Sequence, residues 1–263
     1  MEIRIMDEIK RSVEYSVKRS QALRNCESHI ADILWKATQK VVTASKRYRG
    51  AGRLTNESAL LSYAKNITAE AEEDIEKYIS AYSKASCKIL GIDSENTDEF
   101  LKGDIYGLTT KERNTAYLAN FAEDIVRMIK AGTLMNYTDQ QILSSVRTSY
   151  KDPYKSSVVT KAQKKDINIA TPSYGKGYYR NAYHNIVRNA KQVISIAWGR
   201  TEQEYGKESG AVGYQVFRGS SFPCQVCDDL CGYVHKIGTM VIPAHVGCVC
   251  RAEFIFKDNN KNE

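Results

Sequence analysis

Cysteine and histidine gather in the C-terminal part of the chain at a spacing typical of metal sites. Cys224 and Cys227 form a Cys-x2-Cys pair, and a later His-x2-Cys-x-Cys segment carries His245, Cys248 and Cys250. Thiolates separated by two intervening residues can converge on one ion, and a second turn that faces the first can complete a tetrahedral shell. The spacing predicts a zinc ion held by the first pair, the histidine and either of the last two cysteines.

Three thiolates and one imidazole would fill the four positions that zinc prefers and would leave none for water. We therefore expect the zinc ion to be structural and not catalytic. The alternative is a cluster of reduced cysteines that packs a small β-ribbon without any metal. Cys231 and His235 flank a turn at Gly232 and are not expected to be ligands.

The composition favours a folded, helix-rich and basic protein. Of the 263 residues, 42% are hydrophobic and only four are proline. The formal net charge of +7 suits a nucleic-acid partner or an acidic protein surface. Charges interrupt the first eight residues, which argues against a signal peptide, and no apolar run is long enough to span a bilayer. We expect a reducing cytoplasm, where clustered cysteines act as metal ligands instead of forming disulfides.

Apolar residues recur at steps of three and four along much of the chain, which predicts long amphipathic helices. The first helix is expected from about Met6 to Tyr48, with an apolar stripe that includes Ile9, Val13, Val17, Leu23, Cys26, Ile30, Ile33, Ala37 and Val41. Because Cys26 lies on this stripe, we expect a buried thiol there. A second helix is expected from Asn56 to Leu90, and residues 92–106 are expected to form a polar connector.

Two capping boxes indicate a helical hairpin in the middle of the chain. Thr109 with Glu112 and Thr138 with Gln141 both match the pattern of a Ser or Thr followed three residues later by Glu or Gln. Gly132 lies between them and favours a turn. The two helices that follow these boxes are therefore expected to be joined by a short connection.

The last third of the chain is expected to change from helix to strand. A helix is predicted from Asn181 to Gln203, a strand at Val212–Phe217 and a closing strand at Arg251–Phe256. The fold class is thus mainly α, with long amphipathic helices and a helical hairpin followed by a small C-terminal zinc-stabilised β-ribbon (α+β). The expected domains are an N-terminal helical region (1–106), a hairpin with a basic loop (107–182), and a helix with a Cys/His-rich ribbon (183–263).

Residues 149–182 are basic and rich in tyrosine, and their prolines and glycines prevent a continuous helix. A loop of this kind can follow a phosphate backbone and stack on bases. The alternatives are a solubilising loop and a loop that docks on a protein partner. The candidate nucleic-acid contacts are Lys155, Lys161, Lys164, Lys165, Lys176 and Arg180.

The C-terminal motifs, taken in order, resemble a known signature. Their order is Tyr214-x-Val216, Ser220, Cys224-x2-Cys227-x2-Leu230-x-Gly232 and Pro243-x-His245-x2-Cys248-x-Cys250. This order is similar to the C-terminal signature of the phage Mu F-like minor head proteins, and the resemblance covers about residues 107–256. In that family a proline usually follows the histidine and an arginine separates the last two cysteines, whereas this chain has Val246 and Val249.

The resemblance implies a tailed-phage or prophage structural protein that takes part in head morphogenesis. Such a minor capsid protein would associate with the portal protein, with the major capsid and scaffold proteins, and with the capsid interior. It would be present in few copies per virion, would be made in the host cytoplasm, and would contact packaged double-stranded DNA but no membrane. The Arg-Thr-Glu tripeptide of the family corresponds to Arg188-Asn189-Ala190 or to Arg200-Thr201-Glu202.

Two other classes of function stay open as alternatives. Glu202 and Glu204 resemble the paired glutamates of arginine-directed ADP-ribosyltransferase toxins, but Glu-x-Glu is common on polar helices, and we expect no enzyme. A zinc-ribbon protein that binds nucleic acid would need cations on the ribbon itself. Between Phe222 and Cys250 the one cationic side chain is Lys236, so any contact with DNA is expected upstream of the ribbon.

Overall fold

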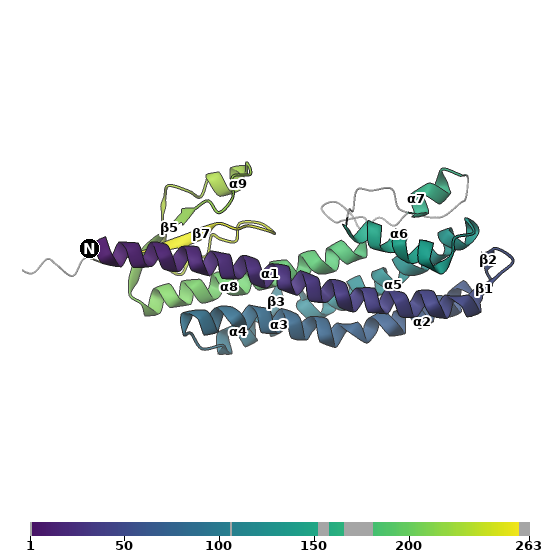
Figure 1. Cartoon of the computed structure of the whole chain (residues 1–263). Helices are drawn as coiled ribbons and strands as arrows, with labels where there is room; N and C mark the ends of the chain where they lie inside the picture. Colours follow the sequence, from purple (N-terminus) through teal and green to yellow (C-terminus); the bar gives the residue numbers. More distant parts are fainter. Residues whose placement is uncertain (1, 106, 152–157, 166–180, 258–263) are drawn as a thin grey trace, which may run out of the picture. The chain divides into compact units, whose positions relative to one another are not determined.

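The computed structural model describes residues 2–105, 107–151, 158–165 and 181–257, and most of these residues are helical (Figure 1). A small three-stranded antiparallel sheet lies in the C-terminal part of the chain. The predicted mainly helical chain with a small C-terminal β element is therefore confirmed. Within the described ranges, no helix combines the length and the apolar character that crossing a membrane requires.

The chain divides into two compact units, and each unit is assembled from segments that are distant in sequence. Unit 1 contains Met1–Glu27, Tyr78–Gly107 and Ala190–Glu263, and unit 2 contains Ser28–Lys77 and Leu108–Asn189. The cysteine-rich segment therefore belongs wholly to unit 1.

The helices and strands follow one another along the chain as Figure 1 labels them. The helices are α1 (Glu2–Ala44), a 3-10 turn (Ser45–Tyr48), α2 (Glu57–Ala69), α3 (Ala71–Leu90), α4 (Glu95–Lys102), α5 (Thr110–Leu134), α6 (Asp139–Lys151), α7 (Val158–Gln163), α8 (Ala182–Glu208) and α9 (Gln225–Asp228). The strands are β1 (Arg49–Gly50), β2 (Arg53–Leu54), β3 (Asp104–Ile105), β4 (Leu108–Thr109), β5 (Ala211–Phe217), β6 (Val234–Lys236) and β7 (Arg251–Phe256).

Local capping signals set the starts of the hairpin helices, as the sequence predicts. At the start of α5, Thr109 Oγ1 accepts the Glu112 N–H at 3.2 Å, and Glu112 Oε2 accepts the Thr109 N–H at 2.8 Å. Thr138 and Gln141 make the same reciprocal pair at the start of α6, at 3.3 and 2.8 Å. Both capping boxes are thus confirmed, because each satisfies two backbone donors that the first helical turn leaves open.

Two boundaries predicted from periodicity are wrong. The single helix expected from 56 to 90 consists of α2 and α3, which are separated at Glu70. The expected polar connector contains α4, at whose start Asp93 Oδ1 accepts the Glu95 N–H at 2.7 Å and in which Thr97 is buried. A helix of eight residues makes little more than two turns, too few for its apolar period to stand out in the sequence.

The core of unit 2 includes a set of stacked aromatic rings. Tyr150 at the end of α6 stacks on Tyr183 of α8 with ring centroids 4.2 Å apart. The Tyr150 hydroxyl also lies 2.9 Å from Thr38 Oγ1 of α1. Asp124 of α5 accepts the Ala182 N–H at 2.8 Å and so holds the start of α8. These contacts join α1, α5, α6 and α8 within that unit.

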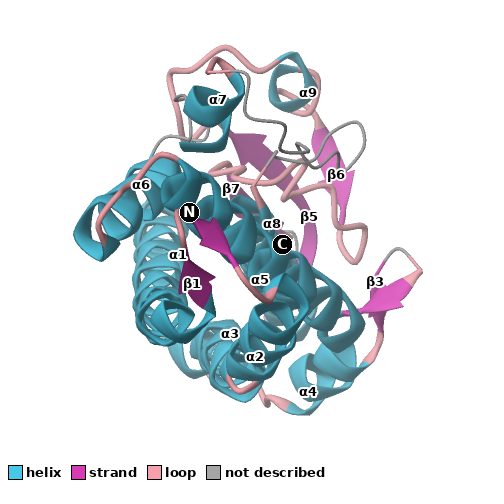
Figure 2. Cartoon of the chain, turned by 90° about the vertical axis from the view of Figure 1, so that its right-hand side faces the viewer, coloured by secondary structure: helices cyan, strands magenta, loops and turns pink. Residues whose placement is uncertain are grey.

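The sheet of unit 1 has the order β6-β5-β7, with β5 in the centre, and Figure 2 shows its three strands in magenta. Tyr214 on β5 is opposite His235 on β6 and Phe254 on β7. Tyr214, Ala252 and Phe254 are buried, and along β7 buried residues alternate with half-buried ones. β6 and β7 are the two edges of this small sheet.

Two glycines let α8 approach the C-terminal segment closely. A Cβ at Gly206 would lie 2.5 Å from Phe254 Cε1, and a Cβ at Gly199 would lie 2.7 Å from the Ile242 carbonyl oxygen. Between them on the same face of α8, Gln203 Oε1 accepts the Gly238 N–H at 3.0 Å. Side chains larger than hydrogen at these two positions would push the sheet and its loops away from the helix.

Side chains of α1 satisfy the outer backbone groups of β7, the edge strand next to the cysteines. Arg19 Nη2 donates to the Cys250 carbonyl at 2.5 Å, and Arg11 Nη2 donates to the Ala252 carbonyl at 2.8 Å. Glu8 Oε1 accepts the Phe254 N–H at 2.8 Å. An edge strand otherwise presents open hydrogen-bonding groups to other chains, so these contacts close that edge.

The apolar stripe expected along α1 is buried only in part. From Leu23 onwards its residues are buried except Ile33, which is half-buried, and Cys26 is fully inaccessible, as predicted. Val13 and Val17, however, are 42% and 50% exposed, so the prediction that the stripe faces a core is wrong in the first half of the helix. The buried face there carries instead the charged residues that bond β7 and α8, and these contacts decide which side of α1 turns inwards.

Candidate metal centre

The first pair of cysteines is placed by a short helical turn. Cys224 precedes α9, and its carbonyl oxygen accepts the N–H groups of Cys227 at 3.0 Å and of Asp228 at 2.9 Å. Arg218 supports the turn, since its guanidinium bonds the Cys224 carbonyl at 3.3 Å and pairs with the Asp228 carboxylate. The two thiols therefore belong to one compact turn.

The second set of sulfur and nitrogen atoms comes from a turn before β7. The Cys248 N–H donates to the His245 carbonyl at 3.1 Å, which closes a short loop between the two residues. Gly247 lies inside this loop at a φ of 79°, a left-handed conformation that favours glycine. Cys250 lies immediately before β7 and is buried, as is Ala252 two residues later.

The two turns bring all five predicted ligands together. Cys224, Cys227 and His245 form one group whose ligand atoms lie within 4.8 Å of one another, and Cys227, Cys248 and Cys250 form a second such group. His245 Nε2 is 3.3 Å from Cys224 Sγ and 3.2 Å from Cys227 Sγ, and the Cys227 and Cys248 sulfurs are 3.9 Å apart. Cys227 is the shared member, and the cluster could hold a metal ion.

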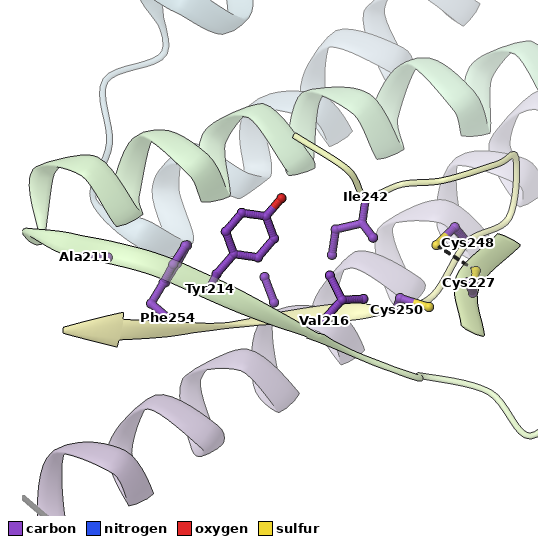
Figure 3. Close-up of a cluster of buried hydrophobic side chains, with 9 residues drawn as sticks. Ala211, Tyr214, Val216, Cys227, Ile242, Cys248, Cys250 and Phe254 are labelled. Atoms are coloured by element: carbon purple, nitrogen blue, oxygen red, sulfur yellow. Dashed lines mark hydrogen bonds between the residues drawn. The ribbon is translucent and has the colours of Figure 1, made fainter. Parts of the chain in front are cut away.

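The surroundings of the cluster are apolar on one side. Figure 3 shows Cys227, Cys248 and Cys250 beside Val216 and Ile242, with a dashed line between the first two cysteines. Cys227, Cys248 and Cys250 are buried, whereas Cys224 is half-buried and His245 is exposed. The site thus has one face in the small core of the sheet and one face towards solvent.

The histidine tautomer suits metal binding. His245 Nδ1 lies 2.9 Å from the carbonyl oxygen of Val246, and because a carbonyl oxygen can only accept, Nδ1 carries the proton. In the neutral ring the lone pair is then on Nε2, which is the atom that faces the sulfurs. A second hydrogen bond of this kind commonly orients a metal-binding histidine.

The thiols of the cluster have different proton affinities. Hydrogen bonding from Cys250 lowers the pKa of Cys248 to about 4, while the same contact and burial raise the pKa of Cys250. Burial raises the pKa of Cys227 to about 12, and a hydrogen bond from the Cys227 N–H lowers the pKa of Cys224. A cation would stabilise all of these sulfurs as thiolates, as metal binding requires.

Cys231 and His235 lie apart from the two groups of ligand atoms. His235 Nε2 donates to the Leu230 carbonyl at 2.8 Å, and Cys231 forms an isolated bridge with Val216. Neither residue is among the metal-binding groups found in the described part of the chain.

The candidate nucleic-acid contacts are described only in part. Lys161 lies in α7, and Lys164 and Lys165 follow it, with all three side chains exposed. The other three candidates, Lys155, Lys176 and Arg180, lie outside the described residues. Contact with nucleic acid through this region stays a prediction.

Sequence reasoning missed the charged residues of α1 that contact the backbone beside the cluster. Arg19 is 1% exposed and bonds the Cys250 carbonyl, and Arg11 lies in an ion pair with Glu8. The available signal was a set of charges spaced by three or four residues on the face opposite the valines, which is usually a solvated face. Only contacts with β7 reveal that these charges are buried.

The tripeptide Arg200-Thr201-Glu202 takes part in packing contacts of unit 1. Glu202 is 2% exposed and pairs with Arg11 at 3.1 Å. Thr201 Oγ1 accepts the Ser86 hydroxyl at 3.0 Å. The carboxylate of Glu204 has a different partner, the amide of Asn96. The two glutamates of the Glu-x-Glu pair are therefore held by separate contacts.

No family model, curated protein or solved structure matches this chain. What the cluster can hold is therefore inferred from its own atoms.

Proposed function

We propose that Cys224, Cys227, His245 and Cys248 bind one structural zinc ion. Tetrahedral zinc has Zn–S bonds of about 2.3 Å and Zn–N bonds of about 2.0 Å, so its sulfurs are about 3.8 Å apart and its nitrogen is about 3.5 Å from each sulfur. The Cys227–Cys248 sulfur distance of 3.9 Å and the two nitrogen–sulfur distances of 3.2 and 3.3 Å, three of the six edges of such a tetrahedron, lie close to these values. Cys248 belongs to a separate group of ligand atoms from Cys224 and His245, so zinc binding would draw its sulfur closer to these two residues. This agreement supports the proposal.

Cys248, not Cys250, is the fourth ligand in this proposal. Cys248 lies in the same turn as His245, and its sulfur is the one that faces Cys227 at 3.9 Å. Cys250 instead continues the inward side of β7 and donates its S–H to Cys248. Its role is to orient the Cys248 thiolate, as groups around metal ligands commonly do.

The charge of the site also suits zinc. Three thiolates, one neutral imidazole and Zn²⁺ sum to one negative charge, which is costly to bury without a cation. Arg19 is buried and bonds the backbone of Cys250, so a guanidinium is already in place beside the sulfurs. The filled shell leaves no position for a substrate, which is why the ion is proposed as structural.

Single cysteine substitutions should separate the ligands from their neighbours. Protein purified under reducing conditions is expected to contain one zinc ion per chain, measured by elemental mass spectrometry. Cys248→Ser should lose the zinc, because an alcohol is a poor ligand, whereas Cys250→Ser should keep it with weakened affinity. Cys231→Ser is the matched control. Loss of zinc in Cys250→Ser with retention in Cys248→Ser would reverse the assignment of the fourth ligand.

We further propose that the protein is a minor head morphogenesis protein of a tailed phage or prophage. The observation that carries this proposal is the order of motifs from Tyr214 to Cys250, which is similar to the signature of the phage Mu F-like proteins. A closed metal site fixed to long helices suits a protein that offers surface to the portal and capsid proteins. The basic residues upstream of the ribbon suit contact with packaged DNA.

Particles produced by the genome that encodes this chain provide the test. Purified heads, freed of loosely bound protein by a salt wash, are expected to contain the chain in few copies relative to the major capsid protein, as measured by quantitative mass spectrometry. A deletion of the gene should leave heads that lack it and that are incomplete or less infectious. Absence of the chain from washed heads would overturn the proposed role.

A further inference from the structure

The cysteine cluster holds one thiol more than a single zinc ion needs. It contains five residues with ligand atoms, whereas zinc takes four, and the proposed zinc ion leaves Cys250 without a metal. Cys250 nevertheless belongs to a complete group, since the sulfurs of Cys227, Cys248 and Cys250 all lie within 4.8 Å of one another. These three residues are here called the thiol triad.

The thiol triad differs from the zinc group in its burial. Cys227, Cys248 and Cys250 are 2%, 1% and 2% exposed. Figure 3 shows them beside the apolar side chains of Val216 and Ile242. The zinc group, by contrast, reaches solvent through the two ligands that the triad does not share. A metal ion held in the triad would therefore have sulfur ligands and no water.

The distances in the triad suit a trigonal metal site. Metal–sulfur bonds of about 2.3 Å in one plane place the three sulfurs about 4.0 Å apart. Cys227 Sγ is 3.9 Å from Cys248 Sγ, and the other two distances are at most 4.8 Å. The Cys250 thiol has hydrogen-bonding contacts with both of the other sulfurs. A small shift of its sulfur is therefore enough to complete the triangle.

We propose that the thiol triad binds a cuprous ion, Cu⁺, as an alternative to the zinc ion. Soft thiolate ligands select Cu⁺, which is commonly three-coordinate with them, whereas zinc takes four ligands. Because the two sites share Cys227 and Cys248, only one of them is occupied at a time. The inference rests on the same cluster as the proposed zinc site, but it does not require zinc to bind there.

The exchange of zinc for copper balances in charge and needs no oxidant. Cu⁺ enters, the Cys250 thiol becomes a thiolate ligand, and its proton passes to Cys224, whose sulfur leaves the metal together with His245. Zn²⁺ is released, and neither metal changes its oxidation state. Cys224 is half-buried and His245 is exposed, so the incoming ion has a route from solvent to the buried sulfurs.

A buried cation beside the triad offsets its negative charge. Three thiolates and Cu⁺ carry two negative charges, one more than the zinc site. The Arg19 guanidinium is 1% exposed, donates to the Cys250 carbonyl at 2.5 Å and acts on Cys248 through its charge. Its Nε has no hydrogen-bond partner among the residues that the structure describes. This open donor and the positive charge of Arg19 both favour an anionic metal–thiolate group.

Anaerobic titration of the reduced, zinc-loaded full-length protein with Cu⁺, in competition with a coloured cuprous chelator, tests the proposal. One copper ion per chain should bind while one zinc ion is released, with both metals counted by elemental mass spectrometry. X-ray absorption at the copper edge should show three sulfur ligands at about 2.3 Å and no nitrogen ligand. A nitrogen ligand on copper would place the ion in the zinc group and overturn the proposal.

Substitutions separate the two sites, because each has ligands that the other lacks. His245→Ala should lose zinc and keep its affinity for Cu⁺. Cys250→Ser should keep zinc and lose at least about tenfold in affinity for Cu⁺, since even changes around a ligand cost that much. Zinc retained by Cys250→Ser also shows that this variant folds. Cys231→Ser, the matched control, should change the binding of neither metal.

The outcomes distinguish the copper site from the zinc site. Equal weakening of copper binding by His245→Ala and Cys250→Ser would overturn the proposal. Complete removal of copper from the native chain by the chelator would overturn it as well. A native chain that binds Cu⁺ through the triad but holds no zinc would support the copper site and contradict the zinc proposal alone.

Discussion

Removing the proposed zinc ion from the reduced protein at neutral pH is expected to unfold the sheet of unit 1 while the helices of unit 2 stay folded. The core of that sheet is small, and three of its nine buried members are Cys227, Cys248 and Cys250. Between β5 and β7 the regular structure consists of α9, with four residues, and β6, with three. We expect so little local structure to be unable to hold its loops without the proposed ion.

The size of this effect follows from the coupling of metal binding to folding. Structural zinc contributes about 10–16 kcal/mol of binding free energy in zinc-finger peptides, and in a larger protein part of the fold survives without it. We expect the free energy of unfolding of unit 1 to fall by several kcal/mol. The loss of stability should be largest in residues 218–250, which contain the turn at Cys224–Cys227 and the turn at His245–Cys248.

Hydrogen exchange measured by mass spectrometry is the suitable readout. After treatment with a zinc chelator, peptides from β5, β6 and β7 should lose protection, and peptides from α5 should keep it. Adding zinc back should restore protection, and Cys231→Ser should behave like the native chain. If the sheet kept its full protection without metal, the cysteine cluster would be a packing core of the kind that needs no ion.

Replacing Arg11 by methionine is expected to destabilise unit 1 by about 3–5 kcal/mol, the usual cost of removing one partner from a buried ion pair. Arg11 pairs with Glu8 at 2.7 Å and with Glu202 at 3.1 Å, and it donates to the Ala252 carbonyl. Without it, two carboxylates that are 8% and 2% exposed lose their counter-ion. Chemical denaturation at neutral pH provides the measurement.

Arg24→Met is the matched control, because Arg24 lies on the same helix and is exposed. Its effect should stay within about 0.5 kcal/mol, as for most surface changes. Adding Glu202→Gln to Arg11→Met should recover part of the lost stability, since it removes one of the orphaned charges. Equal stability of Arg11→Met and Arg24→Met would contradict the proposed importance of the ion pairs that Arg11 makes with Glu8 and Glu202.

The cost of Arg11→Met should also depend on pH. Burial raises the pKa of Glu202 above its ordinary value, although Arg11 and Arg19 act in the opposite direction. The folded state therefore binds a proton on the Glu202 carboxyl more tightly than the unfolded chain does. As a result, the free energy of unfolding falls as pH rises from the ordinary carboxyl range through the folded-state pKa. Loss of Arg11 raises that pKa further, so the variant should be closer to the native stability at about pH 5 than at about pH 8.

The local features of the fold could be predicted because each depends on residues a few positions apart. The capping boxes at Thr109 and Thr138, the buried thiol of Cys26 and the strands around Tyr214 and Phe254 follow from patterns of this kind. The short helix α4 and the break at Glu70 were not predicted, because each covers too few residues for a hydrophobic period to be recognised.

The spacing of Cys224, Cys227, His245 and Cys248 by itself determined that a metal site could form, because two short turns suffice to present its ligands. Only the tertiary structure decided which residues of α1 contact the strand next to this site. The contacts of Arg11 and Glu8 with β7 join residues 241 and 246 positions apart, and no local pattern records them. Those contacts turn the charged face of α1 inwards, and as a physical consequence its valines, which the sequence predicts to be core, face solvent.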